Sequence, residues 1–318
     1  MSAASASAEV PASVVTDAEK VADAADARAG ITTRPARPDE LDRVMARFDA
    51  TWGVGRGPDR SMLQALDHAG NTLLVAIEAP PPVEEPATRA SRDPDPEAPL
   101  PVEEPVKRAS RDPLARTSGF EMPPAASPQP AELLGATLGF LGWSGGVHVH
   151  SHMNAVDPSA RGRGIGVALK LRQRAVCLAH GVTEVRWTYD PLIRRNARMN
   201  LVRLGAEVVA FLPDFYGELR DAISGGDRSD RFEVRWRLDS PRTLRAIDRM
   251  PQPSWRAEGG LSLVADFEHV RAEDPEVAAR LRDASREAFA VLGSDALRPE
   301  LDANGVYVFT RDDPDREA

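Results

Sequence analysis

The chain has 318 residues, of which 42% are hydrophobic and 28% charged, so it is long enough to bury one or two cores. Its 49 acidic residues outnumber its 40 basic ones, and the net charge of −9 disfavours a general nucleic-acid-binding protein, which needs a basic surface. The single cysteine, Cys177, excludes an internal disulfide and a cysteine-rich zinc site. With neither a secretory leader nor an apolar run of ~20 residues in the sequence, we expect a cytoplasmic protein with no membrane and no nucleic-acid partner.

Two stretches contain too few large apolar side chains to offset the entropy of ordering them. Residues 1–28 are rich in Ala, Ser, Asp and Glu, which predicts a disordered tail. Residues 79–130 are rich in proline and contain an internal repeat, because 82–94 recurs with few changes at 101–113. Neither copy has an aromatic residue, so we expect a disordered, solvated insertion and not a stacked repeat fold.

Between these stretches, the hydrophobic periodicity predicts alternating helices and strands. Asp39 and Glu40 suit the first turn of a helix, and Gly181 and Gly205 suit the end of one. The predicted strands are 31–37, 72–77, 133–143, 147–156, 182–189, 206–212 and 232–238, and the predicted helices are 38–48, 62–68, 164–180 and 191–204. Hairpins and two β-α-β crossovers in this order indicate an α+β (mixed α/β) fold with a central mixed sheet.

Residues 241–318 form a C-terminal extension with sparse Leu, Val and Phe. We predict helices at 242–250 and 275–289 and strands at 261–264 and 306–310. A piece of this size with so little apolar surface would be marginal alone. We therefore expect it to pack against the main sheet.

A glycine-rich segment between the strand 147–156 and the helix 164–180 carries the strongest chemical signal. Gly162, Gly164 and Gly166 stand at alternate positions, which lets the backbone turn tightly and align successive N–H groups. Together with the first turn of the helix, these donors suit a pyrophosphate, and Arg161 and Arg163 would add positive charge. Glycines also serve ordinary turns, so the segment alone leaves a structural role open.

Two nucleotide-binding motifs can be compared with this segment. A dinucleotide fingerprint needs a small residue at position 167, where the chain has Val, although Asp190 after the next strand suits a ribose ligand. A phosphate-binding loop of the Gly-Lys-Ser/Thr type is absent from the sequence. A nicotinamide- or flavin-dependent dehydrogenase thus stays an open alternative.

The segment Val156-Asp-Pro-Ser-Ala-Arg-Gly-Arg-Gly-Ile-Gly166 resembles the acyl-CoA-binding signature of the GNAT N-acetyltransferase superfamily. The order of elements over 31–238 is similar to that fold. Further stretches are similar to a poorly characterised bacterial subgroup of predicted acetyltransferases: 188–192, 195–197, Asn200, 204–206, 215–217, 230–232, Trp236 and 265–289. The resemblance implies an acetyltransferase domain over 29–240, interrupted by 79–130 and followed by the extension 241–318.

The same resemblance implies an acetyl-CoA-dependent N-acyltransferase that acts on an amine of a small molecule or a protein. The backbone N–H of Val156 would polarise the thioester carbonyl while the amine attacks it. The implied cofactor-binding residues are Asn154, Ala155 and Val156 for the pantetheine arm, the amides of Arg161, Gly162, Arg163, Gly164, Ile165 and Gly166 for the pyrophosphate, and Asn196 and Asn200 beside it.

The expected catalytic acid is missing. The superfamily often has a tyrosine four residues before the glycine that ends the helix corresponding to 191–204; that glycine is Gly205 here, and the tyrosine position is Leu201. Tyr189 and Tyr216 are the remaining candidate acids, although a packing role suits either equally well, and His150 is the candidate base on a strand face shared with two other histidines. Same-face histidines seldom complete a metal site without further ligands, so we expect no metal.

The missing acid also leaves a second function class open, a non-catalytic acyl-CoA-binding or partner-binding module on the same fold. Family resemblance does not identify the acceptor. The sequence allows a homodimer.

Overall fold

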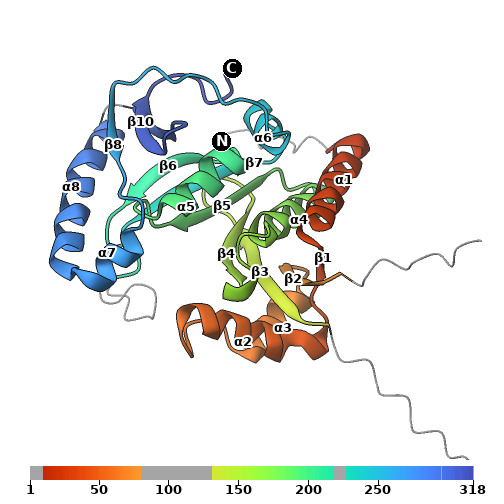
Figure 1. Ribbon diagram of the computed structural model, residues 1–318. Coiled ribbons are helices and arrows are strands. Elements are labelled where there is room, and N and C mark those ends of the chain that lie inside the picture. The colour runs from red at the N-terminus through yellow and green to blue at the C-terminus, as the bar shows by residue number, and fades with distance from the viewer. Residues whose placement is uncertain (1–9, 80–130, 218–226, 295, 318) are drawn as a thin grey trace, which may run out of the picture. The chain divides into compact units, whose positions relative to one another are not determined.

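The computed structural model describes residues 10–79, 131–217, 227–294 and 296–317, and the repeat-bearing insertion, apart from Ala79, lies outside these ranges. Seven strands form one sheet in the order β1-β2-β3-β4-β5-β7-β6 (Figure 1). Their bounds are β1 Ile31–Pro35, β2 Thr72–Glu78, β3 Leu133–Gly142, β4 His148–Val156, β5 Glu184–Tyr189, β6 Glu207–Leu212 and β7 Arg231–Arg237. Only β4 and β5 pair in parallel; all other neighbours in this sheet are antiparallel. The predicted α+β fold with a mixed sheet is confirmed.

Helices cover the two faces of this sheet. On one face lie α4 (Ile165–Ala179), α5 (Arg194–Ala197) and the π-helical turn η3 (Arg198–Arg203); on the other lie η1 (Pro38–Glu40), α2 (Leu41–Trp52) and α3 (Arg60–His68). Strand alternation supplies a core to each face, because Val185 and Trp187 pack toward α4 whereas Leu138 and Met153 pack toward α2. The helix predicted over 191–204 begins only at Arg194 and includes the π-helical turn η3.

The predicted N-terminal tail is wrong over most of its length, because residues Ala12–Ala29 form helix α1. Ala18, Ala22 and Ala25 are buried on one face of α1, which packs on α4 (Figure 1). Alanine buries little area but allows two helix backbones to approach closely, so low apolar content does not exclude a packed helix here. Two hydrogen bonds of 2.8 Å fix the C-terminal end of α1 to β1, because the Asp26 carboxylate accepts from the backbone N–H and the hydroxyl of Thr33.

The C-terminal extension forms a second, three-stranded antiparallel sheet in the order β8-β10-β9. Its elements are α6 Pro241–Ile247, β8 Gly259–Ser262, α7 Phe267–Glu273, α8 Pro275–Ser294, β9 Arg298–Leu301 and β10 Val306–Thr310. Phe289 of α8 lies against the rings of Phe211 and Phe232, with centroid distances of 5.2 and 4.6 Å. Arg242 and Glu300 form a buried bidentate ion pair between α6 and β9.

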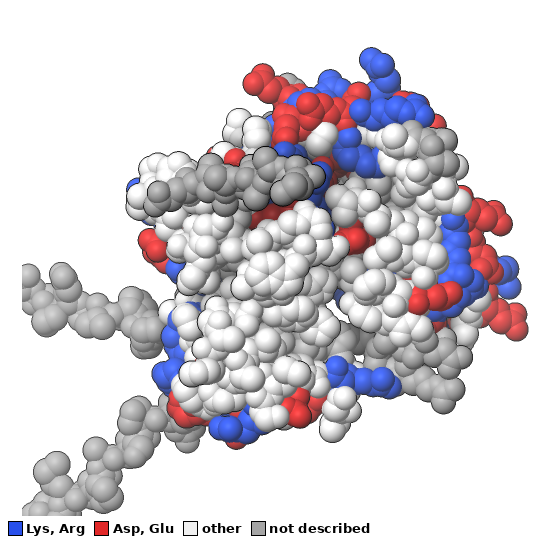
Figure 2. Space-filling view, turned by 180° about the vertical axis from the view of Figure 1, so that it is seen from behind, with Lys and Arg blue, Asp and Glu red and all other residues white. Residues whose placement is uncertain are grey.

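Surface charge is unevenly distributed. On the side opposite to Figure 1, most Lys, Arg, Asp and Glu side chains lie toward the rim, whereas the middle is mostly uncharged (Figure 2). Within the described ranges, no helix has the length and apolar character needed to cross a membrane.

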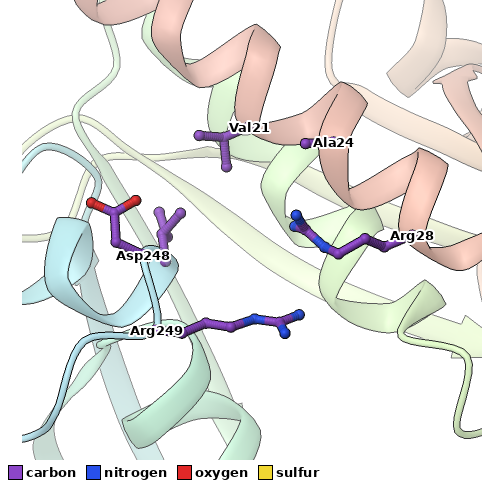
Figure 3. Close-up of a pocket in the computed structure, with 6 residues that line it drawn as sticks. Val21, Ala24, Arg28, Asp248 and Arg249 are labelled. Carbon is purple, nitrogen blue, oxygen red and sulfur yellow. The ribbon is translucent and has the colours of Figure 1, made fainter.

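A cavity of about 270 Å³ lies between α1 and the end of α6 (Figure 3). Val21, Ala24 and Ile247 form its apolar part, and Arg28 and Arg249 extend into it. None of the residues that line it was predicted as a site residue.

Candidate functional site

The candidate site begins where β4 and β5 separate. These parallel strands are in register only at Val149 with Val185 and at His150 with Arg186, although both strands continue beyond these residues. From Ser151 onward the edge of β4 that faces β5 has no strand partner among the described residues. This leaves a gap lined by backbone N–H and C=O groups, next to the predicted pantetheine-binding residues 154–156.

The glycine-rich turn joins the open end of this gap to the N-terminus of α4. Gly162 and Gly164 adopt φ angles of 86° and 92°, which side-chain-bearing residues rarely occupy. Gly164 is the N-cap, and the N–H groups of Ile165 and Gly166 in the first turn have no intrahelical acceptor. The partial positive charge of this helix end favours an anion. The geometry that the sequence predicted for the turn is present.

The two arginines of the turn differ in role. The Arg161 side chain is exposed and makes no hydrogen bond or ion pair to any described residue, so it is available to an anion. The Arg163 guanidinium instead donates to the Ala29 carbonyl at 2.9 Å and pairs with Glu78 at 3.1 Å. The expected positive charge of the Arg163 side chain is therefore directed at α1 and β2. Only its backbone amide remains in the predicted phosphate site.

Asn154 links the gap to the turn. Its Nδ2 donates to the Gly166 carbonyl at 3.2 Å, which ties β4 to the start of α4. Its Oδ1 is buried and has no hydrogen-bond partner among the described residues. An unsatisfied buried acceptor is costly, so this oxygen suits an N–H donor brought by a ligand.

The two predicted asparagines beyond β5 lie in different surroundings. Asn196 is half-buried in α5, and the neighbouring Met199 of η3 lies near Gly166, so this helix borders the glycine-rich turn. Asn200 is buried, and its Oδ1 accepts a hydrogen bond of 3.2 Å from Trp187 Nε1. The prediction that Asn200 contacts the cofactor is corrected, because this hydrogen bond holds the side chain in the core.

His150 lies on the opposite face of β4, in an aromatic cluster. Its ring lies 5.4 Å from Phe140 and 6.1 Å from His152, measured between centroids. His152 has no partner on β3, because Leu138 pairs with Met153 and the next β3 residue pairs with Ser151. This β-bulge directs His152 and Met153 toward the same face.

Burial lowers the pKa of His150 to about 4, and the neighbouring His152 and His148 lower it further in the same direction. The imidazole is therefore neutral at pH 7. A neutral ring can accept a proton, which a general base requires, although at this pKa it does so weakly.

Tyr189 is corrected as a candidate acid. Its side chain is buried beside Phe232, and its hydroxyl lies 3.1 Å from that of Tyr307 in β10. Burial raises the pKa of Tyr189 well above its usual range. The residue packs the main sheet against the C-terminal extension, on the face of β5 that α4 covers. It does not reach the opposite face, where His150, Arg186 and Thr188 form what we call the polar face.

Tyr216 lies on that polar face. Its hydroxyl is 3.1 Å from Thr188 Oγ1, and Thr188 follows Arg186, the register partner of His150, on the same face of β5. The ring is partly exposed and lies near the Arg231 guanidinium. His150 thus lies on β4, and Tyr216, in the turn after β6, contacts β5 through Thr188.

The dinucleotide alternative loses support. Asp190, the candidate ribose ligand, forms a bidentate ion pair with Arg282 of α8 at 2.8 Å, and the mixed sheet differs from the parallel one that a dinucleotide fold requires. Across the described residues, no group of three or more His, Cys, Asp and Glu side chains is placed to hold a metal ion. Cys177 is buried in the core, as expected, and burial raises the pKa of its thiol to about 12.

Sequence reasoning missed Lys170, which is buried in α4 with its Nζ 2.7 Å from Ser151 Oγ. A signal was available, because the chain has only Lys20, Lys107 and Lys170 among 40 basic residues, and Lys170 alone lies within an apolar helix pattern. Ser151 and Thr188, which border the gap, carried no sequence signal.

Comparison with known proteins gave structural matches only. No family model and no curated protein matched the chain. Among the solved structures, Arabidopsis thaliana Naa50 in complex with the bisubstrate analogue CoA-Ac-MVNAL is 14% identical, with a TM-score of 0.40 over 65% of this chain and 97% of that one. Diaminobutyrate acetyltransferase EctA from Paenibacillus lautus, with L-2,4-diaminobutyric acid and coenzyme A, is 13% identical, with a TM-score of 0.40 over 65% and 95%. Ribosomal-protein-alanine N-acetyltransferase from Brucella melitensis is 14% identical, with a TM-score of 0.39 over 64% and 98%.

Likeness at this level says nothing about the reaction. The strand order, the single parallel pair and the glycine-rich turn between β4 and α4 form the arrangement that the sequence resemblance implies. The chain therefore has the fold of the GNAT superfamily of N-acetyltransferases.

Proposed function

We propose that the protein transfers an acyl group from acetyl-CoA to an amine. The observation that carries the proposal is the continuous path from the glycine-rich N-terminus of α4 to the gap between β4 and β5. An anion site at one end and an unpaired strand edge at the other match the pyrophosphate and the amide-containing arm of coenzyme A.

The residues present fit this donor. The amides around Gly164 and the free Arg161 would hold the pyrophosphate, while the β4 backbone over 154–156 would bond the pantetheine arm as an added strand does. The orphaned Asn154 Oδ1 would accept from one of the arm's amide N–H groups. An acyl-CoA contains both chemical features along one flexible molecule, which NAD and ATP do not.

For the reaction, we propose direct transfer. The amine nitrogen attacks the thioester carbon, the C–S bond breaks, one proton leaves the nitrogen and one reaches the thiolate. Val156 lies beside the start of α4 and roughly 20 Å along the strand from His150, so its N–H suits the pantetheine arm, and a backbone N–H of β4 nearer the apex of the gap stabilises the developing oxyanion. His150 accepts the proton from the amine, and Tyr216 donates to the sulfur. These roles replace the earlier assignment of Tyr189.

The low pKa of His150 constrains the acceptor. A base with a pKa of about 4 removes a proton poorly from an alkylammonium ion, so the amine must arrive neutral. We therefore expect an acceptor whose amine has a low pKa, such as the α-amino group of an amino acid or peptide, over a lysine side chain.

A second candidate is a non-catalytic acyl-CoA-binding module on the same fold. It is favoured by Leu201, which is buried where many relatives of this fold have a tyrosine acid, and by the burial of Tyr189. Both candidates require donor binding, whereas only the enzyme releases thiol from acetyl-CoA when an amine is added. Steady binding without turnover on α-amino, aromatic and alkyl amines would select the module.

Calorimetry with acetyl-CoA, CoA, NAD and ATP tests donor binding. Gly164→Glu places a carboxylate in the anion site, and we expect acetyl-CoA affinity to fall at least 30-fold. Gly181→Glu is the matched control, because Gly181 caps the other end of α4, has a similarly positive φ and has equal open space around an added Cβ. Equal loss in both variants, or no binding of acetyl-CoA by the wild type, would contradict the proposal.

Three further assignments stay proposals: the domain limits of 29–240 and 241–318, the cytoplasmic location, and the homodimer.

A further inference from the structure

The Lys170 side chain places an amine in the core. It lies in the middle of α4 and is 3% exposed. Within the described ranges no carboxylate forms an ion pair with it, whereas the buried arginines Arg242 and Arg282 each pair with acidic partners. Burying an unpaired ammonium is costly, and a methionine of similar volume would avoid that cost. The retention of an amine here therefore requires an explanation.

The amine lies between the two strands that border the gap. Lys170 Nζ is 2.7 Å from Ser151 Oγ on β4 and 3.8 Å from the centroid of the Trp187 ring on β5. The last register pair of these strands joins His150 to Arg186, so Ser151 and Trp187 stand at the first position where pairing stops. Lys170 thus occupies the apex of the gap.

Its two partners are themselves held in place. The indole N–H of Trp187 donates to Asn200 Oδ1, which fixes the ring from the η3 side. Ser151 directly precedes His152, the extra residue of the bulge in β4. A second tie between α4 and β4, from Asn154 to the Gly166 carbonyl, lies at the open end of the gap. Helix α4 therefore holds β4 at two points along the edge that is not paired with β5, one near the apex of the gap and one near its open end.

Burial lowers the pKa of Lys170 to about 7, which agrees with an amine that is partly neutral and still held by the hydroxyl and the aromatic face.

We propose that Lys170 is a positioning residue that keeps β4 and β5 apart at the apex of the gap and so sets how far the thioester end of acyl-CoA enters. The inference rests on the proposed function. Loss of the amine would let Ser151 relax toward β5, which would narrow the apex while leaving the anion site at the start of α4 unchanged.

The experiment compares two probes on the full-length protein. Acetyl-CoA would occupy the whole path, whereas 3′,5′-ADP would occupy only the phosphate end. For Lys170→Met we expect a loss of acetyl-CoA affinity of at least 10-fold with 3′,5′-ADP affinity within 2-fold of wild type. In turnover, KM for acetyl-CoA should rise by a similar factor while KM for the amine stays constant.

Gln173→Met is the matched control. Gln173 is also buried in α4 and bonds a strand hydroxyl, Thr72 Oγ1 at 2.8 Å, but β2 lies away from the gap. This variant should lose thermal stability without changing the affinity for either probe. Ser151→Ala is the second test variant. It leaves the Lys170 side chain in place, so it should fold even if Lys170→Met does not. It should weaken acetyl-CoA binding 3- to 10-fold.

A folded Lys170→Met or Ser151→Ala protein that binds acetyl-CoA as the wild type does would overturn the inference and leave the proposed function intact. Equal weakening of both probes would also overturn it, because that pattern indicates general destabilisation. A wild-type protein that binds neither probe would reject the proposed function, and the inference with it.

Discussion

Protonation of Glu40 should destabilise the protein at acid pH by an amount that the structure allows us to calculate. Glu40 is 2% exposed, and its two oxygens accept hydrogen bonds of 2.7 Å from the Arg34 guanidinium, while the Arg37 N–H donates at 2.9 Å. These bonds, led by the one from Arg34, lower the pKa of Glu40 from 4.5 to about 2. At about 1.4 kcal/mol per pH unit, the shift corresponds to roughly 3 kcal/mol of unfolding free energy.

The sign follows from the direction of the shift. Because the pKa is lower in the folded state, the contribution is complete above pH 4.5 and is lost as the pH falls toward 2. Other carboxylates titrate in the same window, so the useful quantity is the difference between wild type and Glu40→Gln. In urea unfolding, that difference should decrease by roughly 3 kcal/mol between pH 6 and pH 2.

Asp39→Asn is the matched control, because Asp39 is adjacent in sequence and pairs with Arg37, but is 71% exposed. Its difference from wild type should stay below about 1 kcal/mol at every pH. A Glu40→Gln difference that is the same at pH 6 and pH 2 would refute the reasoning, since the carboxylate would then contribute nothing through its charge.

Three further outcomes are expected. In turnover assays, Tyr216→Phe should lower kcat about 10-fold or more and leave KM for acetyl-CoA unchanged. Tyr189→Phe should leave kcat within 2-fold and lower the melting temperature, because the Tyr189 hydroxyl is bonded to Tyr307. The reverse pattern would restore Tyr189 as the acid. Because the pKa of His150 is about 4, the imidazole does not titrate between pH 6 and 9, so the rate there should rise with pH as the amine acceptor loses its proton, and the midpoint of this rise should follow the pKa of the acceptor. A midpoint near pH 6.5 that stays fixed when the acceptor is changed would count against this base. Arg249→Gly should stabilise the protein by up to about 1 kcal/mol in thermal unfolding, because Arg249 follows α6 with a φ of 58°, a conformation that favours glycine. A loss of stability in this variant would instead show that the arginine makes a favourable contact in the cavity beside α1.

The sequence predicted the strands and the turn well because both depend on local patterns. Alternating apolar residues placed β7, and glycines that require positive φ placed the turn before α4. Helix α1 was not predictable by the same means, because its stability comes from close contact with α4 and from the bond between Asp26 and Thr33, and neither leaves a strong periodic signal.

The site was only partly predictable for a related reason. Residue type cannot distinguish Tyr189 in the core from Tyr216 on the polar face, since that depends on strand parity and on an aromatic partner 118 positions away in the chain. Arg163 shows the same limit, because a positively charged side chain inside a phosphate-binding motif is bonded to a helix carbonyl and a glutamate instead. The separation of β4 from β5, on which the proposed function depends, is a tertiary property.

The β2–β3 hairpin has a consequence for how this chain tolerates change in length. Its two strands remain paired to their ends, and the Glu78 N–H still donates to the Glu132 carbonyl at 3.3 Å. The chain thus leaves and re-enters the sheet at neighbouring points, on either side of Pro80–Pro130. Since the entropy of closing a loop grows only with the logarithm of its length, such a hairpin can accept, lengthen or lose an inserted segment at a cost of about 0.6 kcal/mol per doubling. The hairpin is therefore a site where new sequence can enter this fold while the strands that carry the gap keep their register.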